Sequence, residues 1–209
     1  YGLGKVLRME GDSAGAWQAE SNARSIFEQV GDRVPWAQVT LSQADLLLDE
    51  NKKIEAAAAI HEASELLAQG NSLRDQAFAD LILARAAISN GKIEEATIAI
   101  SRAKLFATRS RDKELEIASR LESARMDAAT GDLARRESAI RSLHNLVLDA
   151  KAAGYHYASL EARLTLGILQ MDPQSGRSGR AELAALHREA STAGFTLIAD
   201  RAATELRNQ

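Results

Sequence analysis

The sequence predicts an all-α protein, and three observations lead to this prediction. The 209 residues include 40 alanines, the best helix former, and only two prolines. A turn signal recurs about every forty residues, at Gly11-Asp12, Asn51-Lys52, Asn90-Gly91, Gly131-Asp132 and Asp172-Pro173. A second series of helix breakers lies between these turns, at Gly31, Gly70, Ser110, Gly154 and Gly194. Two interleaved series with helical sequence between them indicate a solenoid of stacked antiparallel helix hairpins.

The spacing of apolar residues predicts the helices of the first half in order. A truncated first pair is expected over residues 3–10 and 16–30. Pro35 suits a first helical turn, where the N–H that it lacks would have no intrahelical partner, so the next helix is expected over 36–49. Its partner is expected over 53–68, because four apolar residues recur there on one helical face before Gly70. These four are Ala56, Ile60, Ala63 and Leu67.

The same reasoning predicts three more helix pairs and one single helix. The pairs are 73–89 with 93–108, 113–129 with 133–153, and 157–171 with 179–193. The single amphipathic helix at 196–208 is expected to cap the array, and no stretch alternates as a strand would. We therefore expect one helical-repeat domain over 1–209. Its approximate hairpins are 1–31, 34–70, 72–110, 111–154 and 156–194, with the capping helix at 196–208.

Small residues occupy related offsets within successive hairpins. At 12, 16 and 19 positions after Ala44 stand Ala, Ile and Ala, and the same three residues follow Ala84. This pattern resembles the tetratricopeptide repeat, in which a Leu-Gly-type pair precedes Ala, a large apolar residue and Ala. Leu3-Gly4 and Leu166-Gly167 match that pair. The period of about 40 exceeds the 34 residues of the family. The chain therefore resembles a divergent, longer-helix array of the type attached to bacterial transcription activators and signalling kinases.

The start of the chain and its composition set further expectations. Tyr1-Gly-Leu-Gly-Lys resembles the interior of a helix, so residues 1–209 are expected to be a fragment of a longer protein. The truncated first hairpin would then allow end-to-end homodimers. No apolar run is long enough to span a bilayer, and no targeting segment is visible, so a cytoplasmic location is expected. The absence of cysteine excludes disulfides and thiolate metal sites.

No group of residues predicts catalysis. The four histidines lie in different hairpins, and His61-Glu62 is not followed by the second histidine that a zinc-binding helix needs. The basic residues around 102–113 are interrupted by acidic ones and have only Phe106 nearby, which argues against direct nucleic-acid binding. We therefore expect no enzyme activity, no cofactor and no metal site.

The resemblance implies that the first helices of the hairpins line a concave face that binds peptides or partner helices. Asp45, Arg85 and Arg125 each follow a small residue on such a helix. Arg85 and Arg125 would hold an acidic segment through charge-assisted hydrogen bonds, and Phe78 would be an apolar anchor. The alternative is that both arginines are solvated and paired with residues one helical turn away.

Four leucines also stand in register on these helices: Leu41, Leu81, Leu121 and Leu164. They form either an apolar binding stripe or the core between repeats. The expected function is a non-catalytic scaffold that binds a protein or peptide on its concave face. The alternative is a regulatory or sensor module of a larger bacterial transcription regulator or signalling kinase. Such a module would bind a small effector or the output domain of its own parent.

Overall fold

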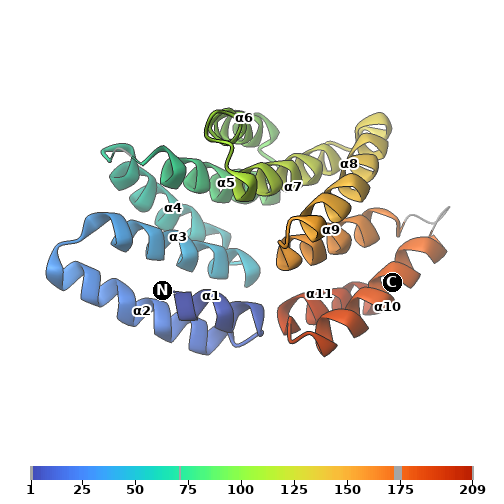
Figure 1. Ribbon diagram of the computed structural model, residues 1–209, viewed down its shortest axis with the longest axis horizontal. Helices are drawn as coiled ribbons and strands as arrows, with labels where there is room; N and C mark the ends of the chain where they lie inside the picture. Colours follow the sequence, from blue (N-terminus) through green and yellow to red (C-terminus); the bar gives the residue numbers. More distant parts are fainter. Residues whose placement is uncertain (1, 71, 172–175, 209) are drawn as a thin grey trace. The chain divides into compact units, whose positions relative to one another are not determined.

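The computed structural model describes residues 2–70, 72–171 and 176–208, and this part of the chain is α-helical without any strand (Figure 1). The predicted all-α class is therefore confirmed for these residues. The helices are α1 Gly2–Met9, α2 Ser13–Val30, α3 Arg33–Asp49, α4 Lys53–Ala68, α5 Leu73–Ser89, α6 Ile93–Ser110, α7 Lys113–Ala129, α8 Leu133–Ala152, α9 His156–Leu169, α10 Gly176–Thr192 and α11 Thr196–Arg207. We call α1, α3, α5, α7 and α9 the first helices, and α2, α4, α6, α8 and α10 the second helices.

Residues in the left-handed backbone region end most of these helices. Six are glycines with φ between 71° and 82°: Gly11, Gly31, Gly91, Gly131, Gly154 and Gly194. The other two are Asn51 at φ 60° and Arg111 at φ 55°. Arg111 explains why α6 reaches Ser110, two residues beyond its expected end. Most of the predicted breakers thus lie at real helix ends, because a left-handed residue redirects the chain after the last turn. Gly70 follows the end of α4 without a positive φ, and the predicted turn at Asp172-Pro173 lies outside the described residues.

The chain divides into two compact units, and the boundary falls inside α7. The first unit comprises Tyr1–Arg8 and Asp12–Ser119, and the second comprises Met9–Gly11 and Arg120–Gln209. In the first unit α3 packs against α2, α4 and α5, and α5 packs against α4 and α6. In the second unit α9 packs against α8, α10 and α11, and α10 packs against α11.

Four of the second helices, α4, α6, α8 and α10, bury the same four positions of their sequences, and this repetition builds the core. In α4, α6 and α8 all four residues are at most 3% exposed. They are Ala56, Ile60, Ala63 and Leu67; Ala96, Ile100, Ala103 and Ala107; and Ala139, Leu143, Leu146 and Ala150. In α10 the corresponding residues, Gly179, Leu183, Leu186 and Ala190, are also buried. The small residues of this pattern bring helices together closely.

Two glycines permit close approaches between α9 and α10. A Cβ at Gly167 of α9 would lie 2.7 Å from the Leu183 side chain of α10, and one at Gly179 would lie 2.5 Å from the backbone of Gln170. Both distances are too short for a real Cβ, so a larger residue would displace the Leu183 side chain at position 167 and the backbone itself at position 179. Gly167 belongs to one of the two Leu-Gly pairs noted in the sequence. Among the described helices, none is both long and apolar enough to cross a membrane.

Candidate partner-binding surfaces

The four leucines in register belong to the core. Leu41, Leu81, Leu121 and Leu164 are only 3–5% exposed. Leu41 packs with Ala63 and Leu67 of α4, and Leu164 packs with Leu183 and Leu186 of α10. The alternative that they form the core is confirmed, and an apolar binding stripe at these positions is excluded.

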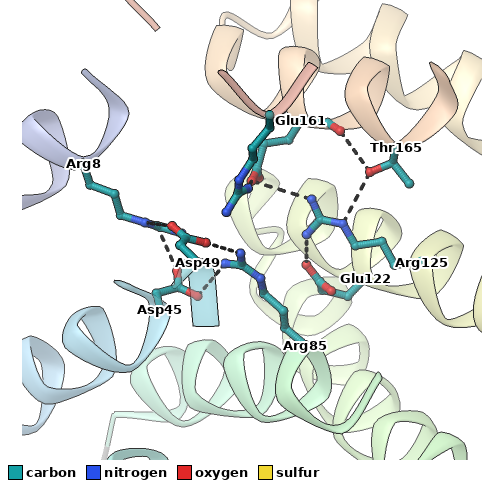
Figure 2. Close-up of polar contacts among 9 residues, drawn as sticks. Arg8, Asp45, Asp49, Arg85, Glu122, Arg125, Glu161 and Thr165 are labelled. Carbon is teal, nitrogen blue, oxygen red and sulfur yellow. Dashed lines mark hydrogen bonds and ion pairs between the residues drawn. The ribbon is translucent and has the colours of Figure 1, made fainter. Parts of the chain in front are cut away.

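Asp45 and Arg85, two of the predicted site residues, contact each other directly. The Nη1 atom of Arg85 donates to Oδ1 of Asp45 at 2.8 Å, and its Nη2 atom donates to Asp49 (Figure 2). Arg8 contacts the same two aspartates, with Nε 2.6 Å from Asp49 Oδ2 and Nη1 3.1 Å from Asp45 Oδ2. We call these four residues, Arg8, Asp45, Asp49 and Arg85, the Arg–Asp cluster.

The Arg–Asp cluster links three successive first helices, α1, α3 and α5. Each contacting arginine–aspartate pair is separated by 36 to 41 positions in the sequence, which is close to one repeat. The side chains are partly buried. Asp49 is 6% exposed, Arg85 is 19% exposed and Asp45 is 23% exposed. Opposite charges in such surroundings attract more strongly than on an open surface, because less water screens them. The alternative of solvated arginines with partners one turn away is therefore wrong for Arg85.

Arg125 lies in the second unit and has its own partners. It donates to Oε1 of Glu122 on α7 at 2.5 Å, and it lies 3.6 Å from Glu161 of α9 (Figure 2). Its Nε is 3.4 Å from Thr165 Oγ1, 40 positions further along the chain. Here one partner is local, as the alternative proposed, and the others lie one repeat away. The side chain is 18% exposed.

Phe78 is half-buried and lies two turns before Arg85 on α5, so both residues share a face of that helix. Its ring packs against Ala77, Leu81 and neighbouring residues of the first-unit core. The Arg74 guanidinium lies over the ring, 4.8 Å from its centre. We call Asp45, Asp49, Phe78 and Arg85 the first-helix face.

Two cavities missed by the sequence reasoning lie between successive second helices. One, of about 280 Å³ among α4, α5 and α6, is lined by His61 and Asn90. The other, of about 560 Å³ among α8, α9 and α10, is lined by His144 and Gln170. The histidines occupy equivalent positions of the pattern, one residue after Ile60 and one residue after Leu143. His144 Nε2 and Gln170 Nε2 are 3.4 Å apart. A comparison of side chains at equal repeat positions would have indicated this recurrence.

A third cavity, of about 270 Å³, lies at the turn between α2 and α3. Phe27, Trp36 and Leu66 give it an apolar wall, and Glu28 and Glu62 also line it. We call it the Trp36 cavity. Its residues come from α2, the α2–α3 turn, α3 and α4, which no motif connects in the sequence.

The described side chains contain no group of three or more His, Asp or Glu residues arranged to hold a metal ion. Comparison with known proteins returned no family model that matches the chain and no curated protein that matches it. The resemblance to tetratricopeptide repeats, and the function that it implies, remain predictions.

Proposed function

We propose that this chain is a non-catalytic protein-interaction scaffold that binds a peptide or helix of a partner. In this proposal its helices form a right-handed, tetratricopeptide-like solenoid of antiparallel hairpins, capped by α11. The observation that carries the proposal is the recurrence of the same four buried positions in α4, α6, α8 and α10. A core built from repeated units leaves a repeated surface, and extended surfaces of this kind are used to bind other proteins.

We propose the first-helix face as the binding site for the partner. Asp45 and Arg85 keep about a fifth of their side-chain surface exposed, and half-buried Phe78 lies on the same helix face as Arg85. Arginine and aromatic residues contribute strongly to the centres of protein interfaces. The aspartates hold the Arg85 fork in one orientation, so less side-chain entropy is lost when a partner binds. Arg125, with Glu122 and Glu161, would serve the same purpose in the second unit.

A double substitution tests this proposal without changing net charge. Asp45→Asn with Arg85→Gln removes one charge of each sign and leaves the Arg8–Asp49 pair in place. The matched control, Asp80→Asn with Arg102→Gln, does the same at a pair between α5 and α6. Affinity for a partner identified by affinity purification, measured by calorimetry, should fall about tenfold for the first variant and change less than twofold for the control. Equal affinities for both variants would contradict the proposed face.

A second candidate function is a sensor module that binds a small effector, and the cavity of about 560 Å³ favours it. Its volume falls within the range of small-molecule sites. His144, Gln170 and Ser178 could orient a ligand there, above the apolar surface of Val147 and Leu148. Native mass spectrometry of the purified chain with a metabolite extract should then detect a bound compound, which is lost in Ala181→Phe. An unchanged mass in both proteins would remove this candidate.

A further inference from the structure

The Trp36 cavity combines an aromatic wall with acidic side chains. The rings of Phe27 and Trp36 and the side chain of Leu66 line it, and all three are half-buried. Glu28, Asp32 and Glu62 also line it, against a single basic residue, Arg33. The carboxylates therefore outnumber the cations at its wall. An aromatic face beside carboxylates attracts cations through the ring quadrupole and through the opposite charge.

The chain itself already places a cation on this wall. The guanidinium carbon of Arg24, on α2, lies 4.4 Å from the centre of the Trp36 ring. The same guanidinium lies 3.7 Å from a carboxylate oxygen of Glu62, and both side chains are more than a third exposed. An exposed ion pair contributes little to stability, so a competing cation can replace Arg24 at low cost. Arg24 thus indicates the chemistry that fits the ring.

We infer that the Trp36 cavity binds an arginine side chain of a basic partner segment, which displaces Arg24 from the ring of Trp36. Glu62 and Glu28 pair with the incoming guanidinium, and Phe27 and Leu66 contact its methylene groups. The cavity faces solvent at the α2–α3 turn, where an extended segment has access. Charge complementarity supports a basic partner, since residues 1–100 carry 15 acidic and 9 basic side chains. This inference rests on the proposed interaction function for the identity of the partner.

Removal of Arg24 provides a test in which binding should strengthen. The probe is an acetylated tetra-arginine amide, with tetra-glutamine as the neutral comparison. The chain has two tryptophans, so Trp17→Phe leaves Trp36 as the only indole to follow by NMR. Tetra-arginine should shift the Trp36 indole N–H signal in a saturable manner, and tetra-glutamine should leave it unchanged. In Arg24→Gln the affinity for tetra-arginine should rise three- to tenfold, because the internal competitor is gone.

Two matched variants separate this site from general charge attraction. Lys104→Gln makes the same change in net charge at an exposed position of α6. It should alter the affinity for tetra-arginine less than twofold. Glu62→Gln should weaken binding several-fold, and added salt should weaken it further. An Arg24→Gln protein that binds no more tightly than Lys104→Gln would overturn the inference, as would the absence of any shift with tetra-arginine. Asp45→Asn with Arg85→Gln should leave this binding unchanged, so the inference and the proposed first-helix face fail independently.

Discussion

Glu20 occupies, in α2, the position that Ile60, Ile100 and Leu143 hold in the later second helices. It is fully buried, with Ser42 Oγ donating to its Oε1 at 2.5 Å. Its Oε2 finds no hydrogen-bond partner among the described residues. Burial raises the pKa of Glu20, and the Ser42 hydrogen bond and the nearby Arg8 charge oppose this rise only in part. The neutral form of the carboxyl is therefore more favoured in the folded protein than in the unfolded chain.

The raised pKa of Glu20 predicts a definite pH dependence. In the unfolded chain Glu20 loses its proton near its ordinary pKa of 4.5, whereas in the folded chain it does so at higher pH. Its contribution to stability is thus fully present below pH 4.5 and is lost as the pH rises through the folded pKa. Glu20→Gln, which has no charge to bury, should raise the free energy of unfolding more at pH 7 than at pH 4. Urea unfolding at pH 4 and pH 7 checks this, and a variant equally stabilised at both pH values would contradict it.

The Arg–Asp cluster predicts unequal costs for two arginine substitutions. Arg85→Met leaves Asp45 and Asp49 partly buried with one guanidinium fewer, so the free energy of unfolding should fall by roughly 2–3 kcal/mol. Arg102→Met removes a pair in which the arginine is 59% exposed and should cost less than about 1 kcal/mol. Thermal unfolding of both variants measures the difference. Similar losses in the free energy of unfolding would contradict this prediction, because partial burial would then not strengthen the ion pairs of the cluster.

At the scale of the elements, the left-handed residues at the helix ends give a clear prediction for stability. Arg111 adopts φ 55°, a conformation that glycine provides at most other left-handed helix ends in this chain. The Cβ of arginine makes this left-handed conformation strained, whereas glycine has no Cβ and adopts it without strain. Arg111→Gly should therefore stabilise the protein by about 0.5–1 kcal/mol, and Gly131→Ala, at φ 74°, should destabilise it by a similar amount. Melting temperatures that shift in the same direction for both variants would contradict this account.

The helices were predictable because their signals are local. The bounds of α4, α5 and α7 agree with the sequence prediction, since apolar periodicity and a following breaker define each helix within its own twenty residues. Long-range charge pairing was not predictable in the same way. Asp49 meets Arg85 across 36 residues, one helical turn short of the repeat, so a search at the repeat interval alone finds only Asp45. The Trp36 cavity depends on side-chain directions on α2, α3 and α4 around one turn, which periodicity does not determine.

At the scale of the whole molecule, one repeated pattern occurs in both compact units, whose division along the chain falls within α7. The same four buried positions occur in both, in α4 and α6 of the first unit and in α8 and α10 of the second. In a repeat protein each unit is stabilised mainly by its neighbours along the chain. Each repeat can then be stabilised locally, and under the proposed scaffold function the surface residues at equal repeat positions would vary to select a partner.

The most direct test of the central claim replaces Phe78 with the photoreactive analogue p-benzoylphenylalanine and cross-links the chain to its purified partner. The same analogue at Leu105, which is 53% exposed on second helix α6, is the matched control. If the chain is a scaffold that binds through its first-helix face, position 78 should form a cross-linked product and position 105 should form none. A product at position 105 with none at position 78 would contradict the account.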